Sequence, residues 1–144
     1  MLIEREEILS LIPHQHSMCL LDVVEEWSAR SLCCRSLSHC SPDNPLRRNG
    51  LLSALHLVEY GAQATAVHGG LLARERNTTA PPGFLASLRD VRLHVNRIDD
   101  IAEPLLVQAD VLTSSEMGWM YSFNISAAGR ALASGRVSVI LMTG

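Results

Sequence analysis

The longest apolar stretch of the chain, residues 51–72, is hydrophobic nearly all round. A helix with apolar residues on every face belongs in an interior rather than on a surface. Small residues recur along the stretch and would let strands approach it closely: Ala54, Gly61, Ala62, Ala64 and Ala66. The pattern therefore predicts one long buried helix in the middle of the chain.

Three shorter patterned segments precede this helix. Residues 3–11 carry apolar residues at helical spacing and end before Pro13, which predicts a short amphipathic helix. Residues 19–24 and 30–37 favour two strands, and the Pro, Asp, Asn and Gly residues of 41–50 are typical of a loop.

After a polar connector at 74–83, the pattern changes to strands. Val91, Leu93 and Val95 alternate with polar residues, as in a half-buried strand, and residues 105–111 alternate in the same way. Residues 120–126 and 130–142 predict a hairpin about Ala127-Ala128-Gly129. One helix with this many strands predicts an α+β domain in which an antiparallel sheet wraps around the helix.

Such a sheet covers only one side of the helix, so we expect a second subunit to cover the rest. The 144 residues fit a single domain, 1–144. A net charge of −3 disfavours a nucleic-acid-binding protein. Acidic residues near the start of the chain disfavour a signal peptide, and polar residues interrupt the apolar stretch, so we expect a cytoplasmic protein with no membrane span.

The four cysteines are Cys19, Cys33, Cys34 and Cys40. Cys33 and Cys34 are adjacent and should point to opposite faces of a strand, which makes them poor partners for each other. A zinc site that used either of them with His39 and Cys40 would lack a second closely spaced ligand pair. We therefore predict buried free thiols, and neither a metal nor a cofactor.

Glu59 is the only formal charge between Arg48 and Arg74. His56 lies three residues before it and Gln63 four residues after it, so the three side chains share one helical face. A carboxyl group in apolar surroundings beside an imidazole is a suitable acid/base pair. A buried Glu can equally hydrogen-bond a loop backbone and serve structure alone. Near the helix end, we expect His68 to act as a cation that suits the C-terminal dipole.

Four segments resemble, in order, the 3-hydroxyacyl-acyl-carrier-protein dehydratases of the FabA/FabZ type. Residues 12–22, IPHQHSMCLLD, resemble the Pro-His opening of that family, and residues 57–64, LVEYGAQA, resemble its central helix. Residues 84–93 and 131–137 are similar to its later strands. The stretch PLRRNG at 45–50 resembles most closely the divergent dehydratase-like subunits of aryl-polyene and related polyketide-type clusters.

This resemblance implies a hotdog fold, a dimer of two hotdog subunits, and acyl-phosphopantetheine substrates on an acyl carrier protein. In the family, an imidazole removes the C2 proton and a helix carboxylate handles the departing 3-hydroxyl. The carboxylate corresponds to Glu59, with Gln63 beside it. The backbone amide that polarises the thioester corresponds to the region of Gly50 and Leu51.

The family histidine, on a Gly-His-Phe-Pro loop, has no counterpart, because Pro45 stands at that place. His39 is the favoured substitute if the loop carries an insertion, and His56 is the second. The third alternative is that no histidine of this chain serves, and a partner hotdog subunit supplies it.

Three functions stay open on these residues: a 3-hydroxyacyl dehydratase, a non-catalytic partner subunit in a homodimer or heterodimer, and an acyl thioesterase. Docking of an acidic carrier protein would require a basic rim, and the candidates for it are Arg47, Arg48, Arg92 and Arg97.

Overall fold

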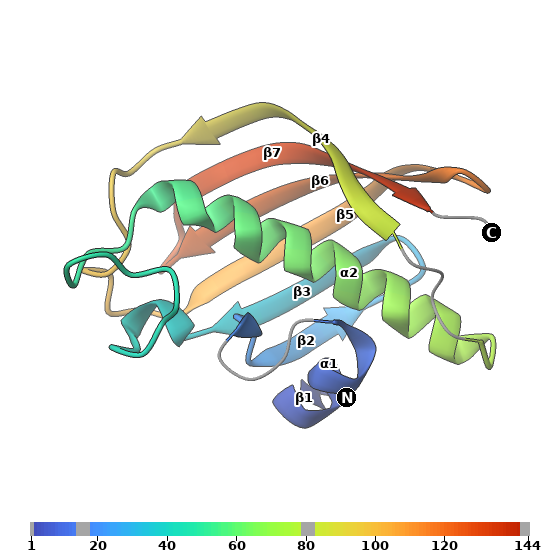
Figure 1. The fold of residues 1–144 in the computed structure, drawn as a ribbon, viewed down its shortest axis with the longest axis horizontal. Helices are drawn as coiled ribbons and strands as arrows, with labels where there is room; N and C mark the ends of the chain where they lie inside the picture. Colours follow the sequence, from blue (N-terminus) through green and yellow to red (C-terminus); the bar gives the residue numbers. More distant parts are fainter. Residues whose placement is uncertain (1, 14–17, 79–82, 142–144) are drawn as a thin grey trace.

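The computed structural model describes residues 2–13, 18–78 and 83–141. The predicted α+β architecture is confirmed: one long helix lies across one face of an antiparallel sheet (Figure 1). The helices and strands are β1 Ile3–Glu4, α1 Arg5–Leu11, β2 Val23–Trp27, β3 Ser31–Ser36, α2 Leu57–Glu75, β4 Gly83–Leu93, β5 Leu105–Ser115, β6 Gly118–Ala127 and β7 Arg130–Leu141. Two short 3₁₀ helices, η2 Ser38–Cys40 and η3 Ala54–His56, flank the loop before α2.

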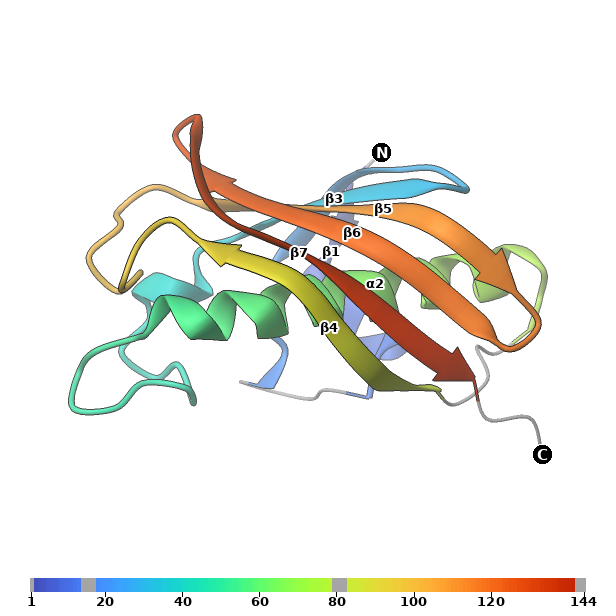
Figure 2. The ribbon, with the colours of Figure 1, turned by 90° about the horizontal axis from the view of Figure 1, so that it is seen from above.

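The seven strands form one sheet in the order β1-β2-β3-β5-β6-β7-β4, with every neighbouring pair antiparallel. β4, which follows α2 in the chain, crosses back to pair with β7 and forms one edge of the sheet (Figure 2). β6 and β7 pair about Ala127-Ala128-Gly129, so the hairpin predicted there is confirmed. The hydrophobic core lies between α2 and the face of the sheet that it covers.

α2 approaches the sheet closely at Gly61. A Cβ atom placed there would lie 2.7 Å from the ring of Phe123, which is fully buried on β6. Gly135 on β7 leaves room for the other side of the same ring, since a Cβ there would lie 2.8 Å from it. These two glycines let the aromatic ring fill the space between helix and sheet.

The long helix begins later than predicted. Residues 48–51 form a tight turn in which the backbones of Arg48 and Leu51 hydrogen-bond each other and Asn49 and Gly50 both have positive φ, 53° and 77°. This turn is followed by an extended Ser53, whose side chain accepts a hydrogen bond from the Leu55 amide and starts η3. Turn chemistry thus overrides the apolar character of residues 51–56.

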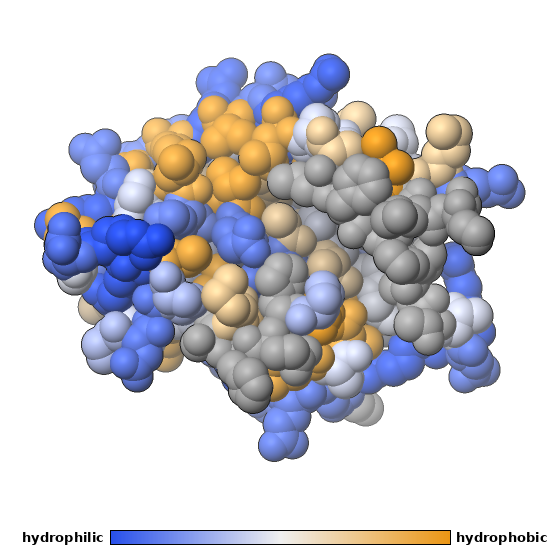
Figure 3. Space-filling view, viewed as in Figure 1, coloured by the Kyte–Doolittle hydropathy of each residue, from blue (hydrophilic) through white to orange (hydrophobic). Residues whose placement is uncertain are grey.

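The side of α2 that faces away from the sheet is only partly covered by the residues that the structure describes. Its residues are half-buried: Val58, Glu59, Ala62, Ala66 and Gly69. Beside it, the edge strand β4 exposes Leu88, Val91 and Leu93 by 39%, 37% and 40%. Figure 3 shows a hydrophobic area over β4, on the same side of the molecule as α2. This surface agrees with the expectation that a second subunit covers the helix.

His68 differs from its predicted role as a cation at the C-terminal dipole of the helix, because it is fully buried. Its Nε2 lies 2.8 Å from the Ser28 carbonyl and its Nδ1 lies 2.7 Å from the Tyr121 hydroxyl. A carbonyl only accepts, so Nε2 carries the hydrogen and Nδ1 accepts from Tyr121. Burial lowers the pKa of His68, and the hydrogen bond to Ser28 opposes this with a smaller effect. Burial also raises the pKa of Tyr121. A neutral imidazole therefore ties α2 to β6 and to the β2–β3 turn.

The four cysteines are free thiols, as predicted, but they are not all buried. Cys34 is buried on the inner face of β3, and burial raises its pKa strongly, whereas its neighbour Cys33 is half-buried. Cys40 is exposed. Across residues 2–13, 18–78 and 83–141, no helix is long and apolar enough to cross a membrane.

Replacing Gly61 with Ala should lower the free energy of unfolding by about 1–3 kcal/mol, because the new methyl group overlaps the Phe123 ring. Gly69→Ala on the same helix is the matched control, since no atom lies within 4 Å of a Cβ there. That variant should be neutral or more stable by up to about 1 kcal/mol. Urea unfolding of both variants checks this, and equal stabilities would contradict the close approach.

The free energy of unfolding should decrease as the pH falls below about 6.5. The unfolded chain takes up a proton on His68 more readily than the folded protein does, so acid favours unfolding in the interval between the two pKa values. His68→Gln should lower stability near neutral pH and reduce this pH dependence, while the exposed His94→Gln should leave the dependence unchanged. Urea titrations at about pH 7 and pH 5 measure both effects; identical pH dependences in all three proteins would be the contrary result.

Candidate functional site

Glu59 lies in the first turn of α2, on the side of the helix that faces away from the sheet, and its side chain is half-buried. Gln63 lies one turn later and is 1% exposed. The Gln63 Nε2 donates to Glu59 Oε1 over 3.2 Å, so the predicted spacing brings the two side chains together. The carboxyl group thus has one oxygen oriented by a buried amide.

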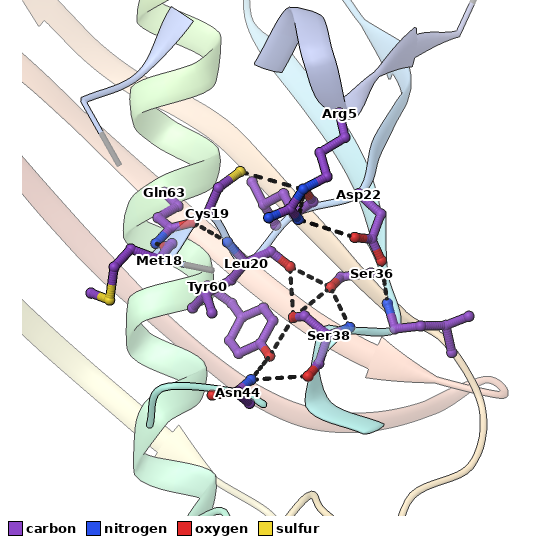
Figure 4. A network of polar contacts seen from close by, with 12 residues as sticks. Arg5, Met18, Cys19, Leu20, Asp22, Ser36, Ser38, Asn44, Tyr60 and Gln63 are labelled. Carbon is purple, nitrogen blue, oxygen red and sulfur yellow. Dashed lines mark hydrogen bonds and ion pairs between the residues drawn. The ribbon is translucent and has the colours of Figure 1, made fainter. Parts of the chain in front are cut away.

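The side-chain amide of Gln63 also forms hydrogen bonds with the segment that leads into β2 (Figure 4). The Leu20 amide donates to Gln63 Oε1 at 2.8 Å, and Gln63 Nε2 donates to the Met18 carbonyl at 2.7 Å. Each hydrogen of the Gln63 amide therefore already has an acceptor. The geometry makes Gln63 a positioning residue that holds residues 18–20 against α2 beside Glu59. The preceding residues His14 to Ser17 of the Pro-His segment lie outside the described residues.

Leu20 is held on its other side by the end of β3 and the start of the loop that follows it. Its carbonyl accepts hydrogen bonds from the hydroxyls of Ser36 and Ser38. The Ser38 hydroxyl also lies 2.7 Å from the hydroxyl of Tyr60, which accepts from Asn44 Nδ2 at 3.3 Å. Figure 4 shows this chain of contacts running from Gln63 past Leu20 to Asn44. The residue next to Glu59 thereby anchors the loop in which the family carries its histidine.

His39 lies in η2 and is fully buried. Its Nε2 donates to the Ile101 carbonyl at 2.9 Å and lies 3.4 Å from Cys40 Sγ. Its Nδ1 is buried and has no hydrogen-bond partner among the described residues. Burial lowers the pKa of His39, so the imidazole is neutral. Within one subunit, the hydrogen bond of the His39 ring leads to the loop at Ile101 and not to Glu59.

His56 is the last residue of η3 and immediately precedes α2. Its side chain is half-buried and makes no hydrogen bond with any residue in the described part of the chain. It lies three residues before Glu59 on a continuous run of helical backbone, so the two positions share one face of the helix.

Gly50 and Leu51 lie in the turn before the helix rather than at its first turn. The Leu51 amide donates to the Arg48 carbonyl at 3.0 Å, and the Gly50 carbonyl accepts from Arg47 at 2.7 Å. Two further donors of the Arg47 guanidinium go to the carbonyls of Ser41 and His39, each at 2.8 Å. The loop is therefore a rigid unit, and its Leu51 amide is already engaged.

Asp99 fixes the chain between this loop and η3. Its Oδ1 accepts from the Leu52 amide at 2.8 Å, and its carboxylate pairs with Arg97. The hydrogen bonds from Arg97 and from the Leu52 amide lower the pKa of Asp99 well below its usual range. The sequence did not indicate Asp99 or Tyr60 as positioning residues, and it predicted Arg97 only as a candidate for the basic rim.

Two of the four arginines proposed for a basic rim are engaged within the chain. Arg47 is occupied by backbone carbonyls and Arg97 by Asp99, while Arg48 is exposed. Arg92 lies on β4 and lines a separate surface with Arg136. No group of three or more His, Cys, Asp or Glu side chains in the described segments could hold a metal ion.

Gln63→Leu should lower the free energy of unfolding by about 1–3 kcal/mol, because it leaves the buried Leu20 amide without an acceptor. The amide hydrogen of Leu20 should then exchange faster. Gln108→Leu is the control: that half-buried side chain pairs with Asp110 on β5, and its loss should cost no more than about 0.5 kcal/mol. Urea unfolding and amide exchange measured by NMR check both, and an unchanged Leu20 exchange rate would show that the clamp is unimportant.

Among solved structures, a chain of the dehydratase heterocomplex ApeI:P from Xenorhabdus doucetiae matches with a TM-score of 0.85 and 26% identity, covering 94% of this chain and 91% of that one. A hypothetical thioesterase with coenzyme A from Streptococcus pneumoniae TIGR4 matches with a TM-score of 0.61 at 9% identity, covering 83% and 84%. Zebra fish thioesterase superfamily member 2 gives 0.64 at 13%, covering 96% and 95%. The two thioesterases share the fold alone.

No curated protein sequence matches the chain. The ApeP-like family model, described as ApeP dehydratase, matches residues 6–143. The hotdog fold and the divergent dehydratase type expected from the sequence are thereby confirmed. The chain belongs to the ApeP-like dehydratase family.

Proposed function

We propose that this chain is a hotdog dehydratase subunit that acts on 3-hydroxyacyl thioesters carried by an acyl carrier protein, with Glu59 as its acid/base group. The observation that carries the proposal is the Glu59–Gln63 pair on the uncovered face of α2. Membership of the ApeP-like dehydratase family supports the reaction class.

In the proposed reaction, an imidazole removes the proton at C2 while the C3–oxygen bond breaks. The Glu59 carboxyl group gives its proton to the departing hydroxyl, which leaves as water, and a C2–C3 double bond forms. Gln63 holds one carboxyl oxygen in place through the hydrogen bond to Oε1. Orientation of an acid by a fixed amide lowers the cost of reaching the reacting geometry.

Among the residues that the structure describes, neither His39 nor His56 hydrogen-bonds Glu59. His39 is buried and bonded to Ile101, and His56 lies on the uncovered face at the helix start. We therefore propose a composite site in which a second hotdog subunit covers α2 and supplies the base, with His56 as the alternative base. The similar ApeI:P protein is a dehydratase heterocomplex, which favours a different subunit as the partner of this chain.

The uncovered surface of the subunit supports this arrangement physically. The outward residues of α2 and the exposed side chains of β4 form an apolar margin beside Glu59. Covering this margin would exclude water from the carboxyl group and strengthen its electrostatic interactions with a bound thioester.

A non-catalytic role in such a pair is the second candidate, and the position of His39 in the loop is the observation that favours it. In that case the partner subunit would carry a complete site of its own. The two candidates differ in whether Glu59 is required.

Glu59→Gln should reduce formation of the 2-enoyl product by at least about 100-fold, because the amide cannot deliver a proton to the departing hydroxyl. The assay uses purified 3-hydroxyacyl carrier protein, with this subunit alone and together with the second hotdog subunit, and mass spectrometry to detect loss of water. Glu75→Gln, at the exposed end of the same helix, should leave turnover unchanged.

Full turnover of the Glu59→Gln complex would assign catalysis to the partner and leave this chain a structural role. Release of free acid instead of enoyl product would indicate a thioesterase. Full activity of this subunit alone would exclude the composite site.

A further inference from the structure

β4 is the edge strand of the sheet. Its arginine side chains and its exposed apolar side chains lie on opposite faces of the sheet. Register with β7 places Leu88 opposite the buried Val137, and Leu93 opposite the buried Ala133, so both leucines belong to the inner face that carries α2. Arg89 lies opposite Arg136, which is exposed on the outer face. Directly opposite residues of a ladder share a face, so Arg89 is on the outer side of the sheet.

A β-bulge makes this separation possible. The register with β7 shifts between Arg89 and Arg92, and Asp90 within the shift has a positive φ of 54°. Three residues of strict alternation would place Arg89 and Arg92 on opposite faces. The extra residue brings Arg92 to the outer face opposite Ser134, while Val91 points inward toward Gly135.

The outer face of this edge is rich in guanidinium groups. Arg92 and Arg136 line a shallow cavity of about 430 Å³ together with Asp90 and uncharged residues of β6 and β7. Asp90 pairs with Arg136 at 3.7 Å. Arg89 and Arg92 form no ion pair with any residue that the structure describes. Arg89 and Arg136 face each other as like charges, and Asp90 pairs with Arg136 rather than with Arg89.

The apolar side chains of the edge locate the centre of an interface. Within residues 86–93 of the strand, Leu88, Val91 and Leu93 are the exposed large apolar residues, and they lie in and around the bulge. A long edge strand with exposed apolar side chains is a template for pairing with another strand. Antiparallel pairing about a two-fold axis at the bulge would set Leu88 opposite Leu93 of a second copy, which buries apolar surface on the inner side.

The same register is unfavourable on the outer side. It sets Arg89 opposite Arg92 of the second copy, and it does so twice because the axis repeats the pair. Like charges directly opposite across two strands are destabilising, and opposite charges are stabilising. A subunit with carboxylates at these places would keep the apolar contacts and replace both repulsions with attractions.

We propose that Arg89 and Arg92 select the partner at the β4 edge: they oppose pairing of this chain with itself and favour a second hotdog subunit that presents acidic side chains opposite them. The inference rests on the proposed pairing of two hotdog subunits. It concerns association alone, so the assay that tests Glu59 does not bear on it, and its failure would leave the role of Glu59 open.

The test reverses the charges of Arg89 and Arg92 and mixes this variant with the wild-type chain. The double variant Arg89→Glu/Arg92→Glu, combined with the wild-type chain, should form a mixed dimer at least about tenfold tighter than the dimer of either protein alone. Sedimentation equilibrium gives the self-association constants, and native mass spectrometry identifies the mixed species. At about 1 M salt, where the Debye length is about 3 Å, the difference should shrink.

Arg76→Glu/Arg130→Glu is the matched control, because it makes the same change in net charge at exposed positions away from β4. Its mixture with the wild-type chain should show no such preference. The neutral variant Arg89→Gln/Arg92→Gln should self-associate more tightly than the wild-type chain, which keeps the test informative if the reversed variant folds poorly.

A wild-type chain that self-associates as tightly as the mixed pair would overturn the proposal. So would a mixture that stays monomeric, or a neutral variant that associates no better than the wild type, because charge would then not control pairing at this edge.

Discussion

The site depends on the way in which the backbone of Leu20 is held from two directions. Its amide donates to Gln63 on α2, and its carbonyl accepts from Ser36 and Ser38. Both backbone groups are buried, so each would carry a desolvation penalty if its partner were lost. Because Gln63 also donates to Glu59, the position of the carboxyl group depends on the same contacts that fasten the chain before β2 to the helix.

The loop before α2 is organised around carbonyl groups rather than around a catalytic side chain. Arg47 donates to three carbonyls, and Asn44 and Ser38 connect the loop to Tyr60. A loop with this many internal hydrogen bonds has little freedom to bring His39 out of the interior. The loop therefore lacks the family's histidine motif and is instead held together by hydrogen bonds among its own polar groups.

The long helix and the strands after it follow from the hydrophobic pattern because each is a regular element with a clear period. The Glu59–Gln63 contact was also predictable, since a four-residue spacing fixes neighbours on a helix. The start of α2 was not, because the Asn49-Gly50 turn and the Ser53 cap outweigh the apolar residues that follow them. His39 is buried against the Ile101 carbonyl, and His68 is buried against the Ser28 carbonyl. These partners are far away in the sequence, so no local pattern predicts them.

The bulge in β4 also bears on how this protein can change over evolutionary time. Without the bulge, strict alternation through the same residues would move every later side chain of the strand, from Arg92 onward, to the other face. Loss of the bulge alone would therefore exchange a charged surface for an apolar one while every exposed side chain of the strand stays the same. Substitutions that remove the positive φ of Asp90 can thus alter the surface of this edge in a relative of the chain while Glu59 and Gln63 on α2 remain untouched.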